Sequence, residues 1–230
     1  SQGIDGRQIA LELETRATGI RLGMVNELRI SGSQEPATQA WNVRGHPSLA
    51  VEMPLVNGQT VVLEKRTALY TSRETPEPLQ AAQMKLEEAA GLTWAELLDA
   101  STAAWVTDWA ACDVEIEGDL ESQTALRFSL YHLLIAAPRK DERVNIGAKT
   151  LSGFGYRGHA FWDTEIFMLP FFTYTQPRLA RNLLSYRYHL LPGARRKAVG
   201  NGCEGAQYPW ESAATGDEVT PTWVPHPTDP

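Results

Sequence analysis

The stretch GFGYRGHAFWDTE, residues 153–165, combines glycine, aromatic rings and carboxylates within one short segment. A second stretch, GAQYPWES, residues 205–212, has the same combination. A pyranose ring has an apolar C–H face that an aromatic ring can cover, and a rim of hydroxyl groups that both donate and accept hydrogen bonds. Carboxylates accept such bonds, whereas arginine and histidine donate them. Both stretches therefore indicate a site for a neutral sugar, and the pattern around them indicates the fold.

Two carboxylates of the first stretch, Asp163 and Glu165, invite an interpretation as the acid and base of a glycosidase. Their spacing argues against it, because residues two positions apart on a helix point about 200° apart and cannot flank one bond. We expect Asp163 to point into a pocket and Glu165 to point elsewhere or to support a neighbour. Residue type alone leaves an N-cap role equally open for Asp163. It favours core packing for Trp162 and Trp210.

The second half of the chain has the pattern of helices joined by loops, and loops between helices are where functional residues usually lie. The last stretch, residues 201–230, contains many prolines and is predicted to be irregular. The predicted segments before it are a helix from residue 121 to Pro138, a polar loop over 139–161, a short helix near 163–169, a helix from Pro177 that stops or bends at Pro192-Gly193, and a short helix to Gly200.

The first 72 residues show the period of two that is typical of half-buried strands. Ile9, Leu11 and Leu13 lie on one face, with polar residues among those between them. The polar segment 31–40 predicts a loop, and Asn57-Gly58 predicts a turn. This part is therefore expected to be antiparallel, too small for a closed sandwich, and left with a sheet edge that needs a partner.

Near residue 74 the pattern changes from strands to helices. A helix is predicted over 78–91, because proline is tolerated in a first helical turn and glycine commonly follows a last one. A second helix starts at Thr93, where Glu96 completes a capping box. Its apolar stripe predicts core packing. The stripe consists of Trp94, Leu97, Leu98, Trp105 and Trp109.

Composition excludes several classes of function. The net charge of −7 over 230 residues is spread along the chain, which argues against binding to nucleic acid or to an anionic membrane surface. The basic cluster at 195–197 is best interpreted as a solvated helix face. Cys112 and Cys203 match no metal or redox spacing and indicate a reducing compartment. The chain has no apolar run of membrane-spanning length, and its start does not resemble a signal peptide.

Three runs of sequence carry a resemblance to a known family: RFSLYHLL at 127–134, IGAKTLSGFGYRGHAFWDTEIFMLP at 146–170, and YPWESA at 208–213. Together they resemble glycoside hydrolase family 65, which contains maltose, trehalose, kojibiose and nigerose phosphorylases and some trehalose hydrolases. The match is close over about 120–223 and looser before it. It implies the end of an N-terminal β-sandwich over 1–73, a helical linker over 74–118, and the first helices of an incomplete (α/α)6 barrel over 119–230.

The resemblance also implies a glucosyl subsite lined by Trp162 and Asp163 and supported by neighbours in both stretches. In this family a glutamic acid protonates the glycosidic oxygen while phosphate attacks from the opposite face, with inversion. That glutamate belongs to an Asp-Glu-Tyr-His-like segment that these residues lack. The acid is expected beyond Pro230, the chain alone is expected to be inactive, and Glu211 is not its replacement. The implied site residues are Arg157, His159, Phe161, Trp162, Asp163, Tyr208, Trp210 and Glu211.

The expected function is therefore that of a fragment of an inverting phosphorylase, which would convert an α-glucosyl disaccharide to a hexose and β-glucose 1-phosphate. The alternatives are an α,α-trehalose-type hydrolase and a non-catalytic sugar-binding or interaction module. The expected partners are the disaccharide or glucose and inorganic phosphate as co-substrate, with no metal, no cofactor, no nucleic acid and no membrane. Homodimers are common in the family, and the expected location is the cytoplasm.

Overall fold

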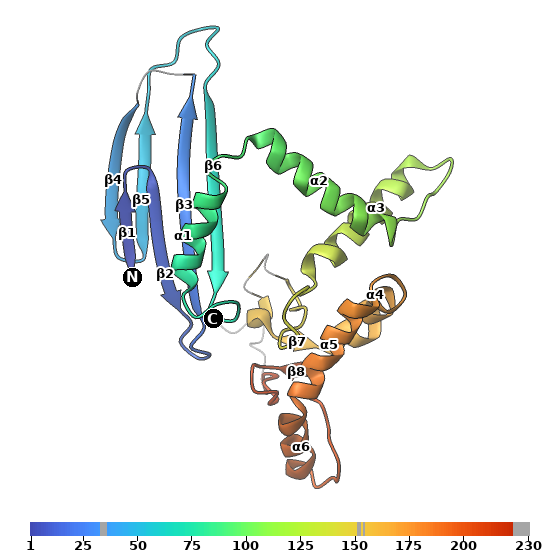
Figure 1. Ribbon diagram of the computed structural model, residues 1–230. Coiled ribbons are helices and arrows are strands. Elements are labelled where there is room, and N and C mark those ends of the chain that lie inside the picture. The colour runs from blue at the N-terminus through green and yellow to red at the C-terminus, as the bar shows by residue number, and fades with distance from the viewer. Residues whose placement is uncertain (33–35, 151–152, 154, 223–230) are drawn as a thin grey trace, which may run out of the picture. The chain divides into compact units, whose positions relative to one another are not determined.

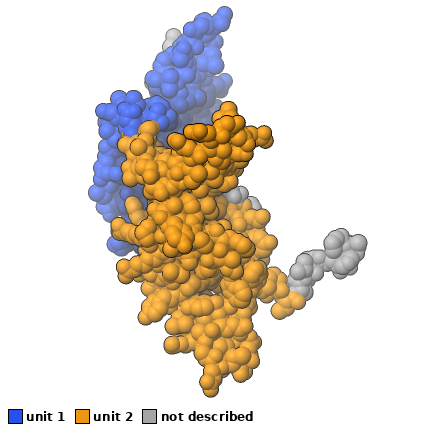
Figure 2. All heavy atoms as spheres, turned by 90° about the vertical axis from the view of Figure 1, so that its right-hand side faces the viewer, with its two compact units in different colours: residues 1–99 blue, residues 100–230 orange. Residues whose placement is uncertain are grey.

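The computed structural model describes residues 1–32, 36–150, 153 and 155–222 of the chain. It divides into two compact units, residues 1–99 and residues 100–230 (Figure 2). The predicted division of the chain into three parts uses other bounds and stays a prediction. Each unit is described by itself below.

The first unit is built on an antiparallel sheet with the strand order β1-β2-β3-β6, accompanied by the hairpin β4-β5 (Figure 1). The predicted turn at Asn57-Gly58 precedes the last strand, and Gly58 has the positive φ of 82° that glycine tolerates. The strands are β1 (Gln2–Asp5), β2 (Gln8–Glu14), β3 (Arg21–Ser31), β4 (Ala37–Val43), β5 (His46–Glu52) and β6 (Val62–Thr71).

Helix α1 (Pro78–Glu88) covers one face of this sheet (Figure 1). Val25 of β3 is fully buried beneath it, and Ala82 of the helix is fully buried above. The helix approaches so closely at Gly23 that a Cβ atom there would lie 2.3 Å from the backbone nitrogen of Leu79. Glycine at this position therefore permits the helix to seat on the sheet.

The opposite face of the sheet carries Ile9 and Leu11, as the alternation in the sequence predicts. These residues line a hollow of about 480 Å³ together with residues 45–49, which form the end of the turn between β4 and β5 and the first part of β5. The predicted loop over 31–40 is wrong at both ends, because β3 extends to Ser31 and β4 begins at Ala37. Every residue of β4 is exposed, so its sequence lacks the apolar alternation that reveals a half-buried strand. Residues 33–35 lie outside the described part of the chain.

Helix α2 (Trp94–Ala110) begins with the predicted capping box. The Thr93 N–H donates to Glu96 Oε2 at 2.7 Å, and the Glu96 N–H donates to Thr93 Oγ1 at 3.3 Å. The predicted core packing of this helix is wrong, since none of its residues, all of which the structure describes, is buried. Trp94 is 67% exposed. An apolar stripe is buried only where another element packs against it.

The second unit is helical, and its core lies where the segment after α3 meets α4 and α5. Ile146, Phe172 and Leu183 are almost completely buried there. The predicted end at Pro138 is confirmed, because α3 stops two residues earlier. The helix from Pro177 ends before Pro192, which instead lies in the first turn of α6, where proline is tolerated. The helices are α3 (Leu120–Ala136), α4 (Leu169–Thr175), α5 (Pro177–His189) and α6 (Leu191–Gly200).

The described residues thus form an antiparallel sheet followed by helices, in the order that the sequence predicts. The β-sandwich and the (α/α)6 barrel remain predictions. No helix within the described ranges combines the length and the apolar character that crossing a membrane requires.

Candidate functional site

A short two-stranded ribbon joins the two aromatic stretches. Strand β7 (Ala160–Phe161) pairs antiparallel with β8 (Glu211–Ser212), so that Phe161 lies opposite Glu211. The residues that follow β7 and precede β8 are Trp162 and Trp210, and they are therefore brought to the same end of the ribbon. Because Phe161 pairs with Glu211, 50 positions later in the sequence, the two stretches form one site.

The aromatic rings of the two stretches contact one another at this ribbon. Trp162 and Trp210 meet edge to face with their ring centroids 5.6 Å apart, and Phe161 meets Trp210 at 5.8 Å. Trp162 is 40% exposed and Trp210 is 46% exposed. These two indoles are therefore not core residues, although residue type alone favours core packing. Phe161 is buried and forms the base of the cluster.

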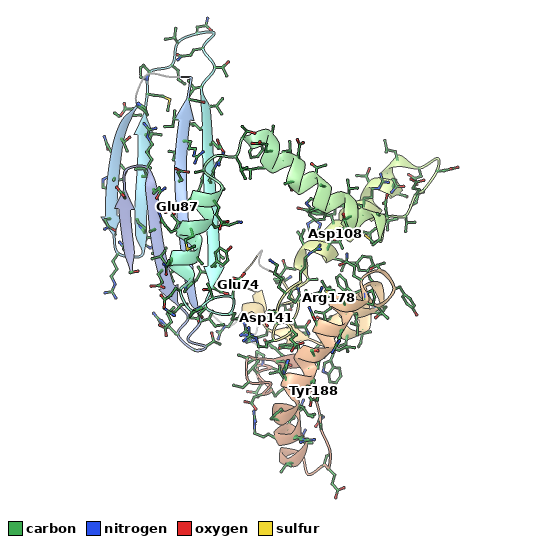
Figure 3. All side chains as sticks on the ribbon, viewed as in Figure 1. Glu74, Glu87, Asp108, Asp141, Arg178 and Tyr188 are labelled. Atoms are coloured by element: carbon green, nitrogen blue, oxygen red, sulfur yellow. The ribbon has the colours of Figure 1, made fainter. Side chains whose placement is uncertain are left out.

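A cavity of about 660 Å³ opens beside Trp162. Tyr208, from the second stretch, lines the same cavity, and its hydroxyl donates to the carbonyl of Arg187 at 3.0 Å. Much of the remaining wall is apolar and includes Tyr188. Tyr188 lies near the C-terminal end of α5 (Figure 3). The lining residues are Trp162, Glu165, Ile166, Leu184, Arg187, Tyr188, Gln207 and Tyr208.

Glu165 also lines this cavity, and it supports a neighbour as the sequence predicts. It accepts two hydrogen bonds from Arg187, at 2.9 and 2.7 Å, and a third from Asn145 Nδ2 at 3.1 Å. Arg187 was not identified from the sequence, although a signal was present. It follows Leu179 and Leu183 at intervals of four, so helical spacing alone places it on the buried face of α5.

Glu211 and His159 form a second polar pair. The two side chains lie 2.7 Å apart between His159 Nδ1 and Glu211 Oε1. Glu211 is buried at 6% exposure. With Nδ1 donating to the carboxylate, the other ring nitrogen of His159 is left for a further partner. Glu211 is therefore already paired with His159, and it is not among the described residues that line the cavity.

Asp163 precedes the π-helical turn η2 (Thr164–Met168), which runs directly into α4. Its side chain is exposed and makes no capping hydrogen bond, so the simple N-cap interpretation is wrong. It is not among the described residues that line the cavity. Arg157, in the turn η1 (Gly155–Gly158), is also exposed and has a positive φ of 52°. Both charged side chains are thus exposed, and neither belongs to the described residues that line the cavity.

Glu218 is a further site residue that sequence reasoning missed. Its carboxylate accepts the backbone N–H groups of Trp210 and Glu211, at 3.1 and 3.2 Å, and also pairs with Lys197 of α6. Partial burial acts to raise the pKa of Glu218. The hydrogen bonds from Lys197, Thr220 and the two backbone groups outweigh it and lower the pKa from 4.5 to about 2. The carboxylate therefore stays charged and holds the backbone of the second stretch in place.

Comparison with known proteins places these features in a family. A family model described as the N-terminal domain of glycosyl hydrolase family 65 matches residues 1–108, and one described as its central catalytic domain matches residues 127–229. A kojibiose phosphorylase of Halothermothrix orenii is 41% identical over 229 residues, covering 94% of this chain and 29% of that protein. A kojibiose phosphorylase of Caldanaerobacter subterraneus is 50% identical over 167 residues, covering 72% of this chain and 22% of that protein.

Among solved structures, a putative kojibiose phosphorylase from the human microbiome superposes with a TM-score of 0.79 at 26% identity. The superposition covers 95% of this chain and 29% of that one. The chain thus spans less than a third of the length of the proteins it matches. None of these comparisons tests the individual site residues, whose assignment to glucose binding stays a prediction.

Proposed function

The chain belongs to glycosyl hydrolase family 65, and we propose that it forms the glucosyl-binding wall of a disaccharide phosphorylase. In the proposed reaction of the whole protein, inorganic phosphate attacks the anomeric carbon of an α-glucosyl disaccharide. The glycosidic oxygen leaves with a proton from a general acid, and the products are β-glucose 1-phosphate and a free hexose. Kojibiose is the first substrate to test, because the two relatives described above are named kojibiose phosphorylases.

The observation that carries this proposal is the contact between Trp162 and Trp210 beside the cavity. Two half-exposed indoles, held edge to face 5.6 Å apart, present apolar surface without the burial of core residues. A glucose ring can place a C–H face on such a surface. Asp163 and Arg157, which are exposed and close to Trp162 in the sequence, offer an acceptor and donors for hydroxyl groups. The apolar area and the polar groups together are the chemistry of a neutral sugar subsite.

The chain's own residues would bind and orient the sugar, and none of them is proposed as the general acid. Glu211, the buried carboxylate of the second stretch, already accepts a hydrogen bond from His159 and is a residue of strand β8. Glu165 accepts three hydrogen bonds from other side chains. We propose that the acid and the phosphate site lie in the remaining length of the parent protein. The homodimer and the cytoplasmic location stay predictions.

The test is a titration of the chain with glucose, in which binding is monitored by tryptophan fluorescence. We expect saturable binding, and we expect Trp162→Phe to weaken it by about tenfold, the effect of roughly 1.4 kcal/mol of lost ring contact. With kojibiose and phosphate, the chain alone should release no glucose 1-phosphate, because loss of a general acid costs about 10²–10⁴-fold in rate.

Trp94→Phe is the matched control, since Trp94 is an exposed tryptophan of α2 outside the site. It should leave the glucose affinity unchanged. Equal affinities of the wild-type chain and Trp162→Phe would contradict the proposed subsite. Turnover by the isolated chain at the rate of an intact phosphorylase would contradict the proposed division of roles.

A further inference from the structure

One arginine holds both stretches of the site. Arg187 of α5 is buried, with 7% of its surface exposed. Its Nε and one terminal nitrogen bind the two oxygens of Glu165 at 2.9 and 2.7 Å. The same terminal nitrogen donates to the Phe161 carbonyl at 2.9 Å, and the other donates to Ser212 Oγ at 2.8 Å. Four hydrogen bonds thus radiate from one planar group.

The partners of Arg187 flank the two indoles of the site. In the first stretch it binds Phe161, directly before Trp162, and also Glu165 a few residues after it. In the second stretch its side chain binds Ser212, and its own carbonyl accepts the Tyr208 hydroxyl, so that Trp210 lies between two held residues. Each indole is therefore flanked on both sides in the sequence by residues that are hydrogen-bonded to Arg187, three of them to its guanidinium and Tyr208 to its backbone carbonyl.

The chemistry of the side chain is specific to arginine. A guanidinium presents five N–H donors in a rigid plane and can bind a carboxylate with two parallel bonds. A lysine keeps the charge but offers a single nitrogen that cannot reach Glu165, Phe161 and Ser212 with the same geometry. Replacement by lysine therefore separates the need for a buried positive charge from the need for the planar fork.

We infer that Arg187 is a positioning residue that sets the spacing of the Trp162–Trp210 pair and thereby the shape of the sugar-binding surface. This inference rests on the proposed function for its link to glucose, but its structural part concerns the ring pair alone. Arg187 acts through Glu165, Phe161 and Ser212 and contributes no proposed contact to the sugar.

The experiment compares Arg187→Lys with the wild-type chain by near-ultraviolet circular dichroism and by glucose titration. The signal of the coupled ring pair is defined as the difference between the wild-type spectrum and that of Trp210→Phe. We expect Arg187→Lys to remove most of this signal and to weaken glucose binding by about tenfold or more, because small displacements of binding groups carry large penalties. In the Trp210→Phe background, Arg187→Lys should cause a much smaller further change, one that comes from rings such as Tyr186, over which the guanidinium also lies.

Arg66→Lys is the matched control, since Arg66 of β6 is equally buried at 7% exposure and also makes several hydrogen bonds, but belongs to the first unit. It should leave the ring-pair signal and the glucose affinity unchanged even if it lowers thermal stability. Equal losses in both lysine variants would overturn the inference, because they would show a general loosening of the fold.

A second variant covers the case in which Arg187→Lys does not fold. Ser212→Ala removes one acceptor of the guanidinium and should reduce the ring-pair signal in the same direction by a smaller amount. A wild-type ring-pair signal in Ser212→Ala and in any folded Arg187→Lys would overturn the inference. If the wild-type chain binds no glucose, the proposed function fails, and the ring-pair signal alone then decides whether Arg187 positions the two indoles.

Discussion

Two buried arginines, one in each unit, show how differently the same side chain can be used. Arg66 and Arg187 are both 7% exposed, and among the described residues they are the buried cations. Arg66 donates to the carbonyls of Ala89 and Leu92, just past the end of α1, and pairs with Glu64 of its own strand. It therefore caps a helix against a sheet, a structural role that the helix terminus requires.

Arg187 instead joins segments that carry the candidate site. Its acceptors in Phe161 and Ser212 are themselves buried, at 8% and 1% exposure. By contrast, the carbonyls that Arg66 binds belong to residues with access to water. The comparison teaches that burial of a cation does not identify a functional residue. What distinguishes the two arginines is which groups would be left unpaired without them.

The largest expected effect comes from removing each charge in turn. Arg187→Met should lower the free energy of unfolding by about 3–5 kcal/mol, because it leaves a carboxylate and buried acceptors without their partner. Arg66→Met should cost about 1–3 kcal/mol, since water can satisfy part of what it leaves. Urea denaturation of both variants measures the difference. Equal costs would break the distinction drawn between the two arginines.

A smaller effect is expected when the paired carboxylate is changed and the arginine is kept. Glu165→Gln keeps the shape of the side chain but loses the charge of a group that accepts two bonds from Arg187, so a loss of about 1–2 kcal/mol is expected. Glu64 accepts one bond from Arg66, and Glu64→Gln should cost less than about 1 kcal/mol. Denaturation midpoints compared with the two methionine variants test this order. A larger loss for Glu64→Gln would reverse it.

The smallest expected effect is a loss of stability at acidic pH. It concerns Glu218, which holds the backbone of the second stretch independently of Arg187. Folding lowers the pKa of Glu218 from 4.5 to about 2, so the folded state favours its charged form. The resulting stabilisation is complete above about pH 4.5 and is lost as the pH falls towards 2. Because the group is partly exposed, its contribution should stay below about 1 kcal/mol.

This acid effect can be followed through Trp210, whose backbone N–H donates to the Glu218 carboxylate. The ring-pair signal should weaken between pH 4.5 and 2 in the wild-type chain. In Glu218→Gln it should be weaker at neutral pH and should lose that pH dependence. A signal in Glu218→Gln that still titrates over the same range would assign the acid effect to another group.

Local features of the fold could be read from the sequence because their causes lie within a few residues. The capping box of Thr93 and Glu96, the helix end at Pro138 and the turn at Asn57-Gly58 each depend on neighbouring residues alone. The strand alternation around Leu11 likewise follows from the period of the backbone. The exposed strand β4 was not predicted from the sequence, because neither of its faces is buried.

The candidate site divides in the same way. Its residue types, including Trp162 and Trp210, were evident from two short stretches of sequence. Their contact depends on the β7-β8 pairing between segments 50 residues apart, which no local pattern encodes. The sequence also favoured Asp163 as the carboxylate in the pocket, whereas the described cavity is lined by Glu165. Side-chain direction at the irregular, π-helical start of α4 is set by what packs around it.

The sequence by itself determined the order of strands and helices, the aromatic and charged character of two stretches and the resemblance to a family. Only the tertiary structure decided that α2 stays exposed, that Glu211 is buried and paired with His159, and that Arg187 joins the two stretches. The physical reason is the separation along the chain over which each kind of interaction acts. Propensity, capping and turn chemistry act over a few residues, whereas burial and the satisfaction of a buried charge depend on partners that the chain brings together only when it folds.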